Sequence, residues 1–304
     1  MAQLYLASNY VLAGFGHLQL VYQADAAMPD ALQEVEVQGP DNGFAGNWVY
    51  PAFGRDHLTH TPFYGDPDKY KAVELPAHDA HALWALFAQL DASFAAYGAG
   101  INYEFDQNSN SFINTMLWAV GINLADFAMT TSAITSFPGS GSNVLLGART
   151  DAGADTAIRV VVDLTPYDDD VHTGIGNDSL GGATGSGGRD RLWLGAGDDT
   201  AKGGAGADVL RGEAGDDSLV GGAGNDVLIG GAGRDMLIGG TFAGDVDRYV
   251  FARIADTVGD VLTGFGWADV IDLRRMDADA QRTGDQAFHF STTARANAVS
   301  GPTA

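Results

Sequence analysis

The residues best suited to chemistry in this chain are aspartates that recur every nine residues in its second half. Glycines lie between them, and glycine permits the left-handed and tight backbone conformations that turn carbonyl oxygens inward. Carbonyl and carboxylate oxygens are hard ligands of the kind that calcium takes, about six to eight per ion. The spacing therefore predicts a series of calcium sites. The aspartates are Asp190, Asp199, Asp208, Asp217, Asp226 and Asp235, and Asp178 precedes them with a three-residue insertion in between.

The glycines between these aspartates are expected to shape the ion-binding loops. An alternative is a flexible glycine-rich linker, since residues 171–240 hold 22 of the 42 glycines of the chain. A linker would not need an aspartate in register in six consecutive units, so the periodicity argues against it. The glycines assigned to the predicted metal sites are Gly188, Gly197, Gly204, Gly206, Gly215, Gly222, Gly224, Gly231 and Gly233.

The pattern resembles the RTX (hemolysin-type) calcium-binding repeats, over roughly residues 172–290. The resemblance implies an all-β parallel β-roll, with two repeats in each right-handed turn and ions between stacked loops of alternate repeats. It implies a bacterial protein secreted by the type I route. It also places Asp190, Asp208 and Asp226 along one edge of the roll and Asp199, Asp217 and Asp235 along the other. Ser186, Leu194 and Glu213 replace glycines of the pattern, and we expect weaker binding at those turns.

The three residues after each aspartate are predicted to form a short strand whose middle residue points into the roll. Asp199 is followed by Thr-Ala-Lys, so that turn is expected to pack weakly. Without metal the aspartates repel one another, and the roll should be largely unfolded. The inward-pointing residues are Leu192, Leu210, Leu219, Leu228 and Leu237.

A second set of residues, in the first half, suggests acyl chemistry. His17 begins an alternating strand, and Ser109 opens a segment with helical spacing. With residues 103–112 this arrangement resembles the permuted papain-like superfamily (lecithin retinol acyltransferase and PPPDE peptidases), with Ser109 at the Cys position. The resemblance implies a Ser109 nucleophile activated by His17 as base, with Gln38 or Glu36 as the orienting group. The alternatives are an inactivated relative that binds a ligand, and a structural role in which Asn108 and Ser109 cap the helix.

Other metal and nucleophile motifs are weak or missing. The sequence contains neither H-E-x-x-H nor G-x-S-x-G, which disfavours a serralysin-like zinc protease and an RTX lipase. The pairs His57/His60 and His78/His81 have a spacing of three, but zinc needs a third protein ligand that the sequence does not offer. We expect these histidines to be exposed to solvent.

The elements that must position these residues divide into an α+β half and a β half. Residues 1–138 are expected to form an α+β domain, with a first strand at the N-terminus and a strand pair at 16–22 and 35–37. Its helices are predicted over 77–97, ending at Gly98, and over 109–120, ending at Gly121. Residues 139–171 are expected to be a linker or bridge, 172–240 the calcium-binding roll, and 241–304 a C-terminal segment that caps the roll. The capping strands are expected at 247–251, 260–265, 269–273 and 285–290.

Composition narrows the classes of partner. The 39 acidic and 16 basic residues give a net charge of −23, which disfavours nucleic acid and anionic membranes as partners. The chain has no cysteine, and no apolar run reaches the roughly 18 residues of a transmembrane segment. The N-terminus lacks the basic region of a signal peptide, and the tail at residues 301–304 is shorter than expected for a type I signal. Two functions stay open: a secreted amide or ester hydrolase or acyltransferase, and a non-catalytic adhesive or matrix-associated module folded by calcium.

Overall fold

The computed structural model divides into two compact units, Met1–Ile158 and Arg159–Ala304, and each is described separately. In the described residues, no helix is both long and apolar enough to span a membrane. The structure describes residues 2–12, 15–23, 32–35, 70–77, 79–97, 109–130, 136, 143, 145, 148–149, 155–181, 187–240, 244–274, 289–290 and 299–300.

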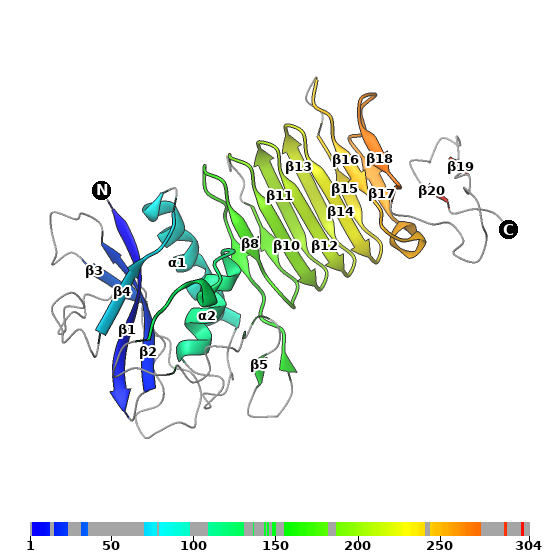
Figure 1. Cartoon of the computed structure of the whole chain (residues 1–304). Helices are drawn as coiled ribbons and strands as arrows, with labels where there is room; N and C mark the ends of the chain where they lie inside the picture. Colours follow the sequence, from blue (N-terminus) through cyan, green and yellow to red (C-terminus); the bar gives the residue numbers. More distant parts are fainter. Residues whose placement is uncertain are drawn as a thin grey trace. The chain divides into compact units, whose positions relative to one another are not determined.

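The first unit is built on an antiparallel four-stranded sheet of order β3-β2-β1-β4 (Figure 1). The second and third strands pair as predicted, with Leu20 opposite Val35, but the third strand covers residues 32–35 instead of 35–37. Leu6 and Leu20 are fully buried, as alternation along half-buried strands requires. The strands are β1 (Gln3–Leu12), β2 (Phe15–Gln23), β3 (Leu32–Val35) and β4 (Tyr70–Glu74), and a separate short pair is formed by β5 (Ala148–Arg149) and β6 (Asp155–Thr156).

Two helices, α1 (Ala80–Tyr97) and α2 (Ser109–Ala119), supply the rest of this core. Helix α1 begins three residues later than predicted because Asp79 caps it, accepting the Ala82 N–H at 2.9 Å. Helix α2 ends one residue earlier than predicted, at Ala119, and Gly121 follows it at φ 70°. Phe94 and Phe112 meet edge to face, with ring centroids 5.2 Å apart. The 3-10 helix η1 (Leu124–Asp126) follows.

The second unit is a parallel β-roll of two six-stranded sheets, one of order β18-β16-β14-β12-β10-β8 and the other β17-β15-β13-β11-β9-β7. Successive strands alternate between the sheets, so two strands make one coil, as predicted. The strands are β7 (Val161–Val162), β8 (Asp170–His172), β9 (Ser179–Leu180), β10 (Arg191–Ala196), β11 (Thr200–Ala205), β12 (Val209–Ala214), β13 (Ser218–Ala223), β14 (Val227–Ala232), β15 (Met236–Ile238), β16 (Arg248–Val250), β17 (Val261–Thr263) and β18 (Val270–Asp272).

The second residue after each repeat aspartate fills the interior of the roll. The five predicted leucines are all completely buried, and Ala201 takes the same place after Asp199. Strands β10 to β14 are six residues long rather than three, because they continue into the glycines of the next unit. Leu194, which replaces one of these glycines, is also fully buried inside the roll.

The roll extends beyond its regular repeats in both directions. Strands β7 and β8 belong to its sheets, although all their residues except His172 lie within the predicted linker, and irregular spacing hides these strands in the sequence. Three predicted capping strands, β16, β17 and β18, continue the same sheets in parallel register. The 3-10 helix η3 (Ile254–Thr257) precedes β17, and the short pair β19 (His289–Phe290) and β20 (Val299–Ser300) is antiparallel.

Candidate metal centre

Each edge of the roll carries a ladder of aspartates linked by hydrogen bonds, and all of them are buried except Asp269, which is half-buried. The backbone N–H of one aspartate donates to Oδ1 of the aspartate in the next coil, as Asp190 does to Asp208 at 2.8 Å and Asp199 to Asp217 at 2.9 Å. The two edges are those that the resemblance to RTX repeats implies. Ladder A consists of Asp169, Asp190, Asp208, Asp226, Asp247 and Asp269, and ladder B of Asp178, Asp199, Asp217, Asp235 and Asp260.

The second carboxylate oxygen of most of these aspartates is buried and has no hydrogen-bond partner in the described part of the chain. A buried charged oxygen without a partner is costly, so its presence indicates a ligand that compensates it. The repeat aspartates of both ladders are at most 2% exposed. The unpartnered atoms are Oδ2 of Asp178, Asp190, Asp199, Asp208, Asp217, Asp226, Asp235 and Asp260.

Glycines create the space beside these oxygens. A Cβ on Gly212 would overlap Asp217 Oδ2 and would lie 2.7 Å from the carbonyl oxygen of Gly230 in the next coil. The absent side chain therefore leaves room where a carboxylate oxygen and a carbonyl oxygen converge. Gly203, Gly221 and Gly230 leave the same space beside their own aspartates.

Each predicted loop glycine adopts a backbone conformation that side chains disfavour. Gly206, two residues before Asp208, has φ 147°, and Gly204 has φ 109°. At the equivalent position of the next unit Glu213 has φ 79°, the one positive φ among described residues other than glycine. Gly188, Gly197, Gly215, Gly222, Gly224, Gly231 and Gly233 all have positive φ as well.

The donor set fits a hard cation bound largely by the backbone. Within the described residues, no three acidic or histidine side chains converge. An ion would therefore take one carboxylate from each coil and complete its shell with carbonyl oxygens and water. Oxygen-only coordination of six to eight ligands is what calcium accepts.

The pKa values of the ladder aspartates also indicate a cation site. Burial raises the pKa of Asp190 to about 8, and repulsion from Asp208 and Asp169 adds to the shift. Burial likewise raises the pKa of Asp217 and of Asp226 to about 7. The protein alone therefore does not stabilise these negative charges, and a cation in the loops would.

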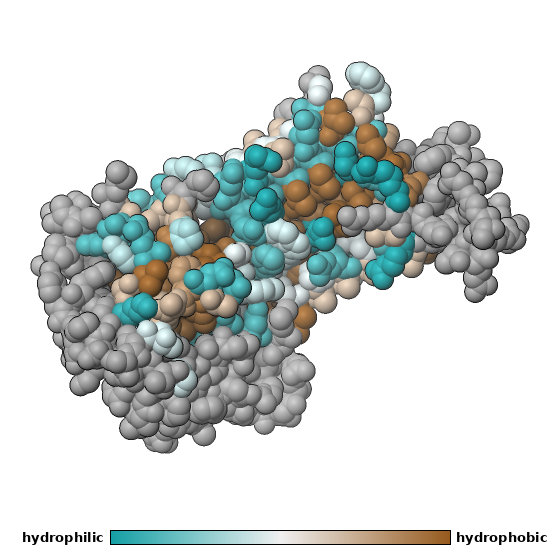
Figure 2. All heavy atoms as spheres, viewed as in Figure 1, coloured by the Kyte–Doolittle hydropathy of each residue, from teal (hydrophilic) through white to brown (hydrophobic). Residues whose placement is uncertain are grey.

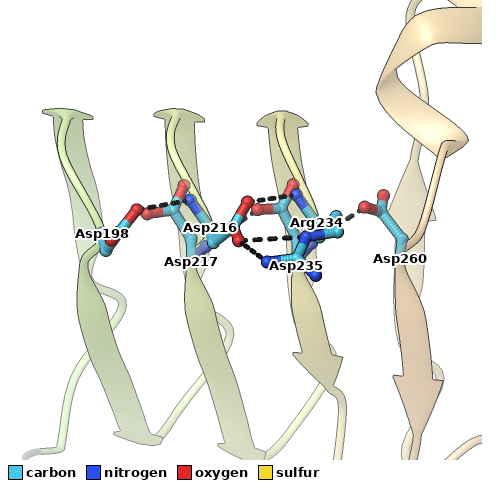
Figure 3. Close-up of polar contacts among 6 residues, drawn as sticks. All are labelled: Asp198, Asp216, Asp217, Arg234, Asp235 and Asp260. Carbon is cyan, nitrogen blue, oxygen red and sulfur yellow. Dashed lines mark hydrogen bonds and ion pairs between the residues drawn. The ribbon is translucent and has the colours of Figure 1, made fainter.

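A second, exposed column runs beside ladder B with the opposite polarity (Figure 3). Here the backbone N–H of Asp216 donates back to Asp198 Oδ1 at 2.9 Å, and that of Arg234 donates back to Asp216 Oδ1 at 2.9 Å. The Arg234 guanidinium also pairs with Asp216 Oδ2. Each coil is thus held to its neighbours in both directions.

The structure also adds aspartates that the repeat pattern missed. Asp169, Asp247, Asp260 and Asp269 lie in the ladders, but the steps that join them to the neighbouring rungs are 21, 25 and 22 residues instead of 18. A search for an aspartate followed two residues later by an apolar side chain would have found them, as in Asp260-Val261-Leu262.

The predicted catalytic residues of the first unit are placed only by their backbone. His17 lies on β2, and Ser109 is the first residue of α2. The neighbours that follow them are in contact, because the Leu18 N–H donates to Asn110 Oδ1 at 2.8 Å. His81 on α1 is exposed, as expected, and hydrogen-bonds the Tyr22 hydroxyl through its ring. Gln38, Glu36, His57, His60 and His78 lie outside the described residues.

Comparison with known families agrees with the geometry of the roll. The model of the RTX calcium-binding nonapeptide repeat (four copies) matches residues 184–219 and 211–244. Searches of curated proteins and of solved structures give no match. The matched residues span the regular coils, from β10 to β15.

Proposed function

We propose that this chain, in which residues 184–244 are RTX calcium-binding repeats, is an exported protein whose roll folds when it meets calcium outside the cell. The observation that carries the proposal is the row of buried Oδ2 atoms without partners. The ligands are the Oδ2 atoms of the repeat aspartates, from Asp178 to Asp235, together with backbone carbonyls of the loop glycines. Extracellular calcium modules bind at roughly 10⁻⁴ to 10⁻³ M, far above cytosolic calcium. The chain therefore stays extended inside the cell and folds outside.

Circular dichroism of the full chain tests the calcium dependence. In chelator the β signal of the roll should be largely missing, and millimolar calcium should restore it. Magnesium is the control, because it demands octahedral geometry and gives up its water reluctantly. A spectrum that is the same in chelator and in calcium would refute the proposal.

The type I route is a separate part of the proposal. Repeats that fold only in calcium suit an exporter that passes an unfolded chain. The test is expression with and without a type I exporter, followed by assay of the culture medium. Equal amounts of protein in the medium of both strains would argue against this route.

A second proposal concerns the first unit: acyl transfer or hydrolysis of an amide or ester by Ser109 with His17 as base. Its support is the hydrogen bond from Leu18 to Asn110, which brings the backbone of β2 beside His17 to the first turn of α2. The free N–H groups at the start of a helix can stabilise a developing anion. The alternative is a non-catalytic adhesive or matrix-associated unit.

An active-site-directed phosphonate probe separates these two functions. We expect it to label wild type and to lose its target in Ser109→Ala and His17→Gln. The control is His81→Gln, because His81 is exposed on a different helix. Labelling that persists in Ser109→Ala, or that is missing in calcium-loaded wild type, would refute the acyl chemistry and favour the adhesive alternative.

A further inference from the structure

The two aspartate ladders end differently after the last regular repeat. In ladder A the final carboxylate is fully used: Asp269 Oδ1 accepts the Asp247 N–H at 2.9 Å, and its Oδ2 accepts the Gly266 N–H at 2.6 Å. In ladder B the final residue, Asp260, uses one oxygen only. Its Oδ1 accepts the Asp235 N–H at 2.9 Å, while its Oδ2 is buried and has no partner among the described residues. At this end, both oxygens of the last carboxylate of ladder A accept hydrogen bonds, whereas ladder B keeps one buried oxygen without a partner among the described residues.

No positive charge of the described residues compensates Asp260, which is 6% exposed. Burial is the largest cause that raises the pKa of Asp260, the hydrogen bond from the Asp235 backbone lowers it, and the carboxylates of Asp235, Asp256 and Asp216 raise it further. The arginines beside this loop are engaged elsewhere. Arg253 binds Asp256 at 3.1 Å, and Arg234, whose stem lies against Gly259, binds Asp216.

We propose that a divalent cation of the calcium type binds between Asp235 and Asp260, one coil beyond the repeats and on the edge of ladder B alone. The proposal rests on calcium binding by the repeats. Strands β15 and β17 are paired in parallel, with Met236 opposite Val261, so the two aspartates occupy successive rungs. Paired strands are about 4.8 Å apart, and calcium–oxygen distances are about 2.3–2.6 Å. One ion can therefore reach Oδ2 of both residues.

The new site differs from the repeat sites in its remaining ligands. The segment before Asp260 is η3 instead of a glycine-rich loop, so fewer carbonyl oxygens can turn toward the ion. Val258 and Gly259 are exposed, which lets water complete the shell. We expect an affinity below that of the repeat sites, and an ion that links the irregular last coils to the regular roll.

Asp260→Asn and Asp272→Asn form a matched pair at the same end of the roll, because Asp272 lies outside both ladders and is paired with Arg248 and Arg274. Calcium bound to the full chain at saturation is counted by native mass spectrometry. We expect Asp260→Asn to bind one ion fewer than wild type, and Asp272→Asn to bind the wild-type number. An equal count in Asp260→Asn and wild type would overturn the proposal.

A direct measurement covers the case in which Asp260→Asn fails to fold. A crystal of the wild-type chain grown in calcium should show anomalous density about 2.3–2.6 Å from Asp260 Oδ2. Filled repeat loops without density at Asp260 would overturn this inference and leave the calcium-binding function intact. A wild-type chain that binds no calcium would instead refute the proposed function itself.

Discussion

Gly221 leaves the space that the Asp226 carboxylate needs, so a single methyl group there tests the whole account of the site. An alanine Cβ at this position would lie 2.8 Å from both Cβ and Cγ of Asp226. The backbone is not in the left-handed region at Gly221, so the substitution adds crowding without backbone strain. The carboxylate must rotate or shift, and it then leaves the position that faces the ion.

The expected loss of calcium affinity follows from the free-energy cost of overpacking a rigid interior. Such substitutions cost about 1–3 kcal/mol, and about 1.4 kcal/mol corresponds to a tenfold change in affinity. Gly221→Ala should therefore weaken calcium binding at this loop by a factor of about 5 to 140. The assay is a calorimetric calcium titration of the full chain, with the β signal followed in parallel.

Gly187→Ala is the matched control in the same roll. Its Cβ would meet only the carbonyl oxygens of Pro166 and Ala205, at the ordinary contact distances of 3.6 and 3.8 Å. We expect wild-type binding from this variant. If Gly221→Ala also titrates like wild type, the carboxylate beside Gly221 does not hold the ion, and the reasoning fails.

Three further predictions concern the roll. Glu213→Gly should raise the free energy of unfolding in calcium by about 1 kcal/mol, because it relieves a side chain at φ 79°; an unchanged urea midpoint would contradict this. Tyr249→Phe should cost about 1–3 kcal/mol, since the Tyr249 hydroxyl accepts the Gly239 N–H at 2.9 Å inside the roll, and the same urea series measures the loss. Without calcium, mild acid should stabilise the roll: the pKa of Asp190 is about 8 and that of Asp226 about 7 in the fold, whereas an unfolded aspartate titrates near 4. Because these folded-state pKa values are raised, the stabilisation by protonation is complete below about pH 4 and is lost as the pH rises through 7 to 8. The measurement is the β signal in chelator between pH 8 and pH 5. A signal that does not grow over this range would contradict the burial of these carboxylates.

The regular part of the roll can be predicted from the sequence because the same nine-residue unit repeats. A step of nine alternates the strands between two sheets and sends Asp190 and Asp199 to opposite edges. The conformation of Gly206 and the burial of Leu210 follow from the same period. The sequence predicts that Leu194, in place of a glycine, weakens its turn, and the structure adds that its side chain fills the interior.

The irregular coils could not be found in the same way. Asp169 belongs to ladder A, but its two oxygens accept hydrogen bonds from the Thr165 N–H and hydroxyl, a pairing that no repeat contains. Asp260 is displaced by the seven extra residues that include η3, since its step from Asp235 is 25 residues and not 18. In the first unit, the alternation of apolar and polar residues predicts the strand pair, and the helical spacing of apolar residues predicts both helices. The contact between Leu18 and Asn110 spans 92 positions, and local patterns carry no information on it.

Because of the pairing register, the roll can be lengthened or shortened only in steps of 18 residues, which is one full coil. Regular strands pair with partners 18 residues away, so Thr200 lies beside Ser218 and Ser218 beside Met236. Removing 18 residues would shorten the solenoid by one full circuit and return every later strand to its own sheet. Removing nine would transfer all later strands to the opposite sheet and exchange the two columns of carboxylates. Duplications or deletions in this region should therefore be tolerated when they add or remove a pair of nonapeptides. In this way the number of bound cations can change in evolution while the fold stays the same.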